Sequence, residues 1–235
     1  MDCRSLEAIV IPYGVTRIAG CTFDFCDKLS AVSIPSTVTS IGYGAFSDCI
    51  SMDSIVIPSS VTSIENNTFK NCSSLTSIDI PESVCKIGQY AFANTGWYDN
   101  QPEGLVYIGS CLYGYKGEMP KNFELVVKEG TKGIADYAFE SSSNLIMETI
   151  PESVSGFNPA TFYGCTSLTS VIIPNSVTTI KKSAFAFCTN LERIGLPESI
   201  TSIASYAFSN CESLSSITLP SIITTIEEGL FNGCK

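Results

Sequence analysis

Residues 72–94 read CSSLTSIDIPESVCKIGQYAFAN, and this 23-residue unit recurs along most of the chain. Its skeleton is C-x-x-L-x-x-I-x-I-P-x-x-V-x-x-I-x-x-x-A-F-x-x. The prolines that stand 23 apart are Pro12, Pro35, Pro58 and Pro81, and then Pro151, Pro174, Pro197 and Pro220. The phenylalanines in the same step are Phe23, Phe46, Phe69 and Phe92, and then Phe139, Phe162, Phe185, Phe208 and Phe231. A fixed period of this length predicts a solenoid of stacked coils.

Each unit is expected to form one coil. Ile78 and Ile80 alternate with polar residues, as in a short strand with one buried face. Pro81 has no backbone N–H group, so the strand should end there and the chain should turn. The pair Ala91-Phe92 is expected to begin a short helical or 3₁₀ turn. A single coil cannot bury its apolar side, but stacked coils can, because equivalent residues pack on one another.

This pattern resembles the BspA-type (Treponema pallidum-type) leucine-rich repeats, whose unit is L-x-x-I-x-I-P-x-x-V-x-x-I-x-x-x-A-F-x-x-C. The resemblance covers nearly the whole chain. It implies a right-handed leucine-rich repeat solenoid, poor in helix, with a parallel β-sheet on the concave face and short turns. Members of this family are mostly bacterial surface or secreted proteins that take part in adhesion and binding of host proteins. The resemblance therefore implies a non-enzymatic recognition module, and it supplies no catalytic residue.

The domain organisation follows from the period. We expect a single solenoid over residues 1–235, with regular repeats at 3–94 and 123–235 and an irregular segment at 95–122. Phe92 and Phe139 are 47 residues apart, which is two periods plus one, so the irregular segment replaces one coil. The chain opens and stops inside a repeat, and its start does not resemble a signal peptide. We therefore expect a portion of a longer surface protein.

Composition excludes several classes of partner. The formal net charge is −10 with 13 basic residues, so nucleic acid is an improbable partner. The sequence has no run of eighteen apolar residues, so this segment is not expected to span a membrane. The expected partner is a protein or glycan on host or neighbouring cells.

Eight of the eleven cysteines occupy one repeat position, three residues after the phenylalanine. They are Cys3, Cys26, Cys49, Cys72, Cys165, Cys188, Cys211 and Cys234. Stacked coils would place neighbours roughly 5 Å apart, within reach of a disulfide. A ladder of equivalent residues has no reason to pair off, however, and we interpret these thiols as small buried apolar groups. No C-x-x-C pair occurs, so no metal site is expected, and no cofactor motif is present.

Enzymatic activity has little support. Histidine is absent, which removes Ser-His and Cys-His nucleophile pairs. Carboxylates such as Glu227-Glu228, or Asp99 with Glu103, are candidates for glycoside hydrolysis only because they are acidic. The alternatives to a recognition module are a structural spacer within a larger surface protein and, less favoured, a hydrolase.

The irregular segment reads TGWYDNQPEGLVYIGSCLYGYKGE over residues 95–118. Residues 105–108 and 111–115 flank Gly109-Ser110, a pattern typical of a β-hairpin with a two-residue turn. The outward strand positions of the regular coils carry small, mostly uncharged residues. The candidate ligand-binding residues are Trp97, Tyr98, Tyr107, Tyr113 and Tyr115, with the neighbouring strand positions Ser77 and Asp79. The alternative interpretation is that these aromatic residues only fill the joint between two stretches of regular coils.

Overall fold

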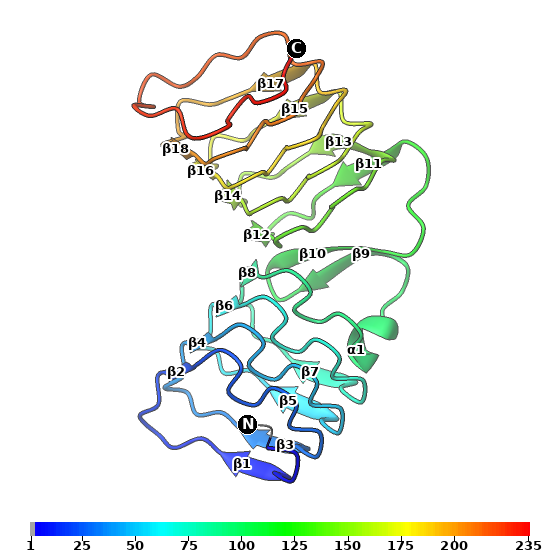
Figure 1. The fold of residues 1–235 in the computed structure, drawn as a ribbon, viewed down its shortest axis with the longest axis vertical. Coiled ribbons are helices and arrows are strands. Elements are labelled where there is room, and N and C mark those ends of the chain that lie inside the picture. Colours follow the sequence, from blue (N-terminus) through cyan, green and yellow to red (C-terminus); the bar gives the residue numbers. More distant parts are fainter. Residues whose placement is uncertain (1–2) are drawn as a thin grey trace. The chain divides into compact units, whose positions relative to one another are not determined.

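The computed structural model describes residues 3–235, apart from the side chains of Met147 and Glu148. The described chain divides into two compact units. The N-terminal unit comprises residues 3–102 with Ile108–Cys111, and the C-terminal unit comprises Glu103–Tyr107 with Leu112–Lys235. Each unit is a solenoid of coils built from short parallel strands (Figure 1). One continuous solenoid over residues 1–235 would require the coils of the two units to stack on one another, and this stays a prediction.

The N-terminal unit contains two lines of parallel strands. The strands of three residues are β1 (Ala8–Val10), β3 (Ala31–Ser33), β5 (Ser54–Val56) and β7 (Ser77–Asp79). The strands of two residues are β2 (Arg17–Ile18), β4 (Ser40–Ile41), β6 (Ser63–Ile64) and β8 (Lys86–Ile87). Ser54 pairs with Ser77 and Ile64 with Ile87, so each partner lies one 23-residue repeat further along the chain. The register confirms the period read from the sequence.

The C-terminal unit repeats this arrangement. Its longer strands are β11 (Phe123–Val126), β13 (Leu145–Thr149), β15 (Ser170–Ile172) and β17 (Arg193–Gly195). Its two-residue strands are β12 (Gly133–Ile134), β14 (Gly156–Phe157), β16 (Thr179–Ile180) and β18 (Ser202–Ile203). The register shifts between Leu125 and Val126, so that Phe123 pairs with Leu145 but Val126 pairs with Thr149. This bulge brings the chain back into the 23-residue phase.

The irregular segment contains a short helix and a hairpin. Helix α1 (Gly96–Asp99) is capped by Thr95, whose side chain accepts a hydrogen bond from the Tyr98 amide. Strands β9 (Gly104–Ile108) and β10 (Cys111–Lys116) are neighbours in a sheet with β12. Gly109 in the connecting turn has a φ of 54°, in the left-handed region. The predicted hairpin around Gly109-Ser110 is therefore confirmed.

The core of each unit contains a column of stacked phenylalanine rings. In the N-terminal unit the ring centroids of Phe46 and Phe69 are 5.5 Å apart with nearly parallel planes. In the C-terminal unit those of Phe162 and Phe185 are 5.4 Å apart. Most of the leucine, isoleucine and valine positions of the repeat are buried beside these columns. Equivalent apolar residues thus pack on one another from coil to coil, as the repeat predicts.

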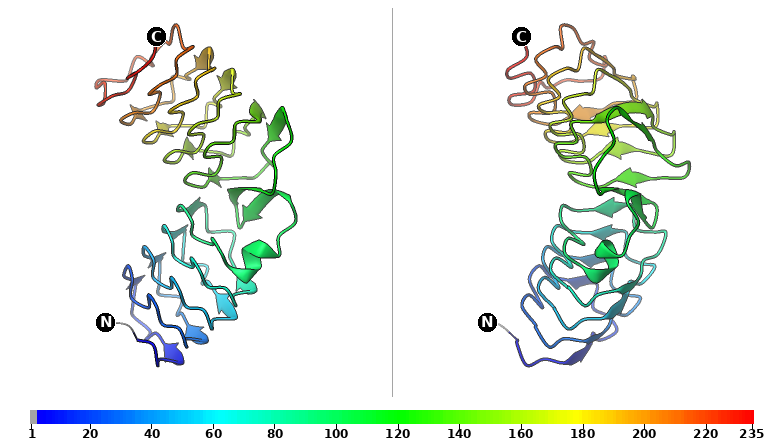
Figure 2. Two further views of the ribbon diagram at one scale, coloured as in Figure 1. Left: turned by 45° about the vertical axis from the view of Figure 1, so that its right-hand side comes forward. Right: turned by 90° about the vertical axis from the view of Figure 1, so that its right-hand side faces the viewer.

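The turns around the phenylalanines differ in detail from the expected helical turn. Tyr90 and Asn94 both have φ values of 58°, so a left-handed residue lies on each side of the Ala91-Phe92 pair. The amide of Phe69 donates to the carbonyl of Ala91 in the next coil at 2.8 Å. Because these amides point along the stack, they form hydrogen bonds between coils instead of a regular helix within one coil. We call this third line of contacts the turn ladder. Figure 2 shows the coils of each unit stacked in line.

Candidate functional site: the strand face

The most regular exposed surface in each unit lies on the longer strands. We call the outward surface of β1, β3, β5 and β7, and that of β11, β13, β15 and β17, the strand face of its unit. In β5, Ser54 and Val56 are exposed while Ile55 between them is buried, and β15 shows the same alternation. The middle residue of each strand therefore anchors the coil, and its two neighbours are free to contact a ligand.

The strand face of the N-terminal unit consists of two rows of residues. The row before the middle residue holds Ala8, Ala31, Ser54 and Ser77, and the row after it holds Val10, Ser33, Val56 and Asp79. Neighbouring residues within a row come from adjacent coils, at the roughly 4.8 Å spacing of parallel strands. Only one of these eight side chains is charged, so an uncharged partner can approach the backbone closely.

Large aliphatic side chains on the strand face correct the expectation of a small lining. Val10 is 75% exposed and Val56 is 63% exposed in the N-terminal unit, and Val126 and Ile172 are 56% and 82% exposed in the C-terminal unit. All four lie two residues before the proline position of their coil. Their repeat position was available in the sequence, but only the structure shows how far these side chains project into solvent.

The predicted aromatic residues Trp97 and Tyr98 lie in helix α1 of the N-terminal unit, and both are half-buried. The Trp97 ring lies 5.6 Å from the Phe92 ring, so it continues the phenylalanine column of this unit. Its amide donates to the carbonyl of Leu75 at 2.6 Å. Burial, and to a lesser degree the Asp99 carboxylate, raise the pKa of the Tyr98 hydroxyl. These contacts support a structural role for helix α1.

The other predicted aromatic residues, Tyr107, Tyr113 and Tyr115, belong to the C-terminal unit and are also half-buried. The Tyr107 hydroxyl accepts a hydrogen bond from the Lys128 amide at 3.0 Å. The Tyr115 ring packs edge-on against Phe123, with centroids 4.9 Å apart. Both residues are thus fastened to the first regular coil of this unit. Ligand binding by the five aromatic residues stays a prediction, as it does for Ser77 and Asp79, which are exposed on the strand face.

Comparison with known protein families gives a match along the whole chain. The sequence profile described as the BspA type leucine rich repeat region, in six copies, matches residues 1–116 and again residues 115–235. The chain belongs to the BspA-type leucine-rich repeat family. No curated protein sequence matches it.

Several solved leucine-rich repeat structures are similar to this BspA-type chain. A leucine-rich repeat protein from Bacteroides ovatus is 26% identical over 88% of this chain, with a TM-score of 0.45, and the match covers 59% of that protein's length. A leucine rich cell surface protein from Faecalibacterium prausnitzii is 24% identical, with a TM-score of 0.45, over 91% of this chain and 79% of the other. The leucine-rich repeat protein of T. pallidum is 26% identical, with a TM-score of 0.36, over 88% and 78% of the two chains.

The cysteines of the BspA-type repeat are mostly buried beside the phenylalanine columns. Six of the eight ladder cysteines are buried, which confirms their predicted place, but Cys3 is exposed and Cys234 is half-buried. The Sγ atoms of Cys49, Cys72, Cys165, Cys188, Cys211 and Cys234 each donate to the carbonyl of a phenylalanine in the preceding coil, as in the contact from Cys188 to Phe162 at 3.1 Å. Burial raises the pKa of the Cys165 and Cys211 thiols to about 12. Such thiols are protonated near neutral pH and are poor nucleophiles.

Thr95 lies 23 residues after Cys72, so it occupies the cysteine position of the repeat. It is the first residue of the predicted irregular segment. It is buried, and its hydroxyl donates to the Phe92 carbonyl at 2.8 Å. A threonine thus takes the place of the thiol at the end of this stack. Its spacing from Cys72 was the signal that could have revealed it in the sequence.

The acidic residues considered for hydrolysis lie at the surface. Glu227, Glu228, Asp99 and Glu103 are all exposed, and Glu228 accepts a hydrogen bond from the Tyr206 hydroxyl at 2.6 Å. Among residues 3–235, no group of three or more potential metal-ligating side chains is arranged to hold an ion. Within the same described range, no helix has both the length and the apolar character needed to cross a membrane.

Proposed function

We propose that this chain is a non-enzymatic recognition module of a cell-surface or secreted protein, and that its strand face binds a protein ligand. Membership of the BspA-type repeat family supports a binding role over a catalytic one. The observation that carries the proposal is the strand face, where Val56 projects from rows of mostly small residues in the N-terminal unit and Ile172 is 82% exposed in the C-terminal unit.

The physical argument concerns the cost of binding. Strand-face residues stand on short, hydrogen-bonded strands, so their positions are already ordered before a ligand arrives. A preformed surface avoids the entropy that a flexible loop would lose. Exposed aliphatic side chains supply apolar area, and the serine hydroxyls beside them can donate and accept hydrogen bonds. An extended segment of a protein fits this combination of spacing and chemistry.

The proposal is tested by binding. Immobilised protein is exposed to a panel of extracellular-matrix proteins and mucin glycans, and each retained ligand is measured again with Val56→Lys and Ile172→Lys. One or both substitutions should weaken a strand-face ligand at least about tenfold, which corresponds to about 1.4 kcal/mol. The matched control is Tyr43→Lys, because Tyr43 is 52% exposed but lies outside the strand face.

Two results would contradict the proposal. A panel with no retained ligand would favour the structural-spacer alternative. An equal loss of affinity with Tyr43→Lys and with both strand-face variants would place the binding site elsewhere. If only mucin glycans are retained and their affinity depends on Ile172 or Val56, the strand face is still the binding site but its ligand is a glycan. Chemical denaturation of each variant would verify that it remains folded.

A further inference from the structure

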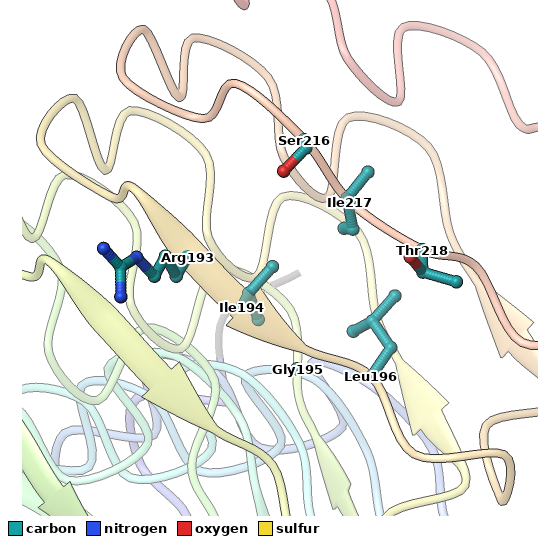
Figure 3. Close-up of a pocket in the computed structure, with 7 residues that line it drawn as sticks. All are labelled: Arg193, Ile194, Gly195, Leu196, Ser216, Ile217 and Thr218. Atoms are coloured by element: carbon teal, nitrogen blue, oxygen red, sulfur yellow. The ribbon is translucent and has the colours of Figure 1, made fainter.

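The last coil of the C-terminal unit lies apart from the strand that precedes it. Strand β17 pairs with β15 in the usual register, Ser170 with Arg193 and Ile172 with Gly195. One repeat further on, residues 216–218 form no strand, and a hollow of about 430 Å³ lies between them and β17. Figure 3 shows this hollow with its lining side chains on the two facing segments. The last coil therefore does not pair with β17 along residues 216–218.

The apolar residues of this coil are less buried than their equivalents. Ile226 is 59% exposed, whereas Ile203, one coil earlier, is 4% exposed. Ile217 is only half-buried, although the same repeat position is buried at Val171 and Ile194. The coil thus carries the apolar residues of a closed repeat without having buried them fully.

The opposite side of the same coil is attached. In the turn ladder, the amide of Phe208 donates to the carbonyl of Leu230 at 3.1 Å, and that of Tyr206 donates to the carbonyl of Glu228 at 3.0 Å. The rings of Phe208 and Phe231 are stacked with centroids 5.9 Å apart. On the strand side, the Ser213 amide donates to the Thr189 carbonyl and the Ser221 amide donates to the Glu198 carboxylate, each at 3.1 Å. The hollow along residues 216–218 therefore lies between these two contacts.

We propose that this hollow binds an extended peptide segment, which inserts as an additional β-strand between β17 and residues 216–218. Within the described residues β17 pairs only with β15, and the hollow lies along its other edge, so backbone groups on that edge can hydrogen-bond to an added strand. Strand rise, strand spacing and sheet thickness together give a strand residue a volume of roughly 160 Å³. The hollow therefore holds about three residues, the length of the strands in this face.

The lining defines the chemistry of the peptide. Ile194, Leu196 and Ile217 line the hollow, so alternate residues of the peptide should be apolar. Arg193 is the only charged residue in the lining, and it is exposed. An acidic residue of the peptide, level with Arg193, would therefore complement the site. This inference rests on the proposed function, because it assumes that the chain recognises a protein segment, but it places that segment along the edge of β17, in a hollow that Val56 and Ile172 do not line.

The probe is a synthetic hexapeptide with the sequence of residues 169–174, TSVIIP, with the change Ser170→Asp. This peptide carries the strand pattern of the repeat and places a carboxylate at the level of Arg193. Binding is measured by fluorescence anisotropy of the labelled peptide. Hydrogen exchange of the amides of residues 216–219 should be fast in the free protein and at least about tenfold slower with saturating peptide.

Matched variants and peptides locate the binding. Arg193→Glu should weaken binding of the acidic peptide about tenfold, and a peptide with lysine in place of the aspartate should bind that variant better. Lys181→Glu makes the same charge change at an exposed position outside the hollow and should alter affinity less than twofold. A peptide with proline at the positions of Val171 and Ile173 lacks their two backbone donors and should not bind.

Two results would overturn the inference. Slow exchange of residues 216–219 in the free protein, equal to that of Arg193–Gly195, would show that the coil closes on β17 and leaves no site. Peptide binding that responds equally to Arg193→Glu and Lys181→Glu would show nonspecific charge attraction. Failure of the strand-face proposal is distinguishable, because it is read from Val56→Lys and Ile172→Lys in the ligand panel and not from the peptide.

Discussion

At the residue scale, the phenylalanine columns determine how much each coil contributes to stability. Phe185 is fully buried, with Phe162 and Phe208 stacked on its two sides at 5.4 and 5.8 Å. Phe185→Ala should therefore lower the free energy of unfolding by about 3–5 kcal/mol. Phe231 is half-buried and stacks on Phe208, so Phe231→Ala should cost less. Denaturant titration measures both, and equal losses would contradict this account of the last coil.

The buried thiols make a second prediction at this scale. Burial raises the pKa of Cys211 from 9.0 to about 12, so the folded protein holds this proton more tightly than the unfolded chain does. This contribution to stability is complete below pH 9 and is lost as the pH rises towards 12, at about 1.4 kcal/mol per pH unit for one thiol. Cys211→Ala should make the fall in unfolding free energy between pH 9 and 11 shallower. The same substitution at the exposed Cys21 is the control.

At the element scale, two glycines can show whether an alanine substitution lowers stability through backbone strain or through steric contact of the added Cβ atom. Gly44 and Gly109 have φ values of 56° and 54°, so alanine at either position should cost about 1–2 kcal/mol. A Cβ atom on Gly44 would meet Cys21 Sγ at 3.5 Å, which is an ordinary contact. On Gly109 it would lie 2.8 Å from the Pro81 carbonyl oxygen, so the hairpin turn would have to move. Gly109→Ala should therefore be the more destabilising change in denaturant titration, and equal costs would show that the turn adapts freely.

At the scale of the whole molecule, charge determines which partners are disfavoured. The chain carries 23 acidic and 13 basic residues, and the strand face of the N-terminal unit has a single charged side chain, Asp79. A polyanion gains nothing from counterion release on such a protein. We expect no measurable binding of a 20-base-pair DNA duplex at 50 mM salt in a fluorescence titration. Saturable binding that weakens steeply with salt would show that a basic patch binds DNA despite the negative net charge of the chain.

The period, the strands and the hairpin could be predicted from the sequence because each depends on local chemistry. Pro81 ends a strand whatever the tertiary contacts, because it lacks a backbone N–H group. The alternation of Ile78 and Ile80 with polar residues determines which face of the strand points to the core. The turn ladder could not be predicted in this form. The left-handed residues Asn67 and Asn71 donate from their amides to the carbonyls of Gln89 and Ala93 in the next coil, and no local pattern encodes those contacts.

The candidate sites divide in the same way. The sequence by itself determined the repeat, the buried positions and the outward position of residues such as Val56 and Ile172, because a strand alternates between its two faces. Only the tertiary structure decided that Trp97 packs on Phe92 and that Tyr107 bonds to Lys128. It alone decided that residues 216–218 stand away from β17, although they carry the same repeat as the strands that close. The physical reason is that a repeat specifies which residues can be buried, whereas actual burial depends on how closely the neighbouring coil packs.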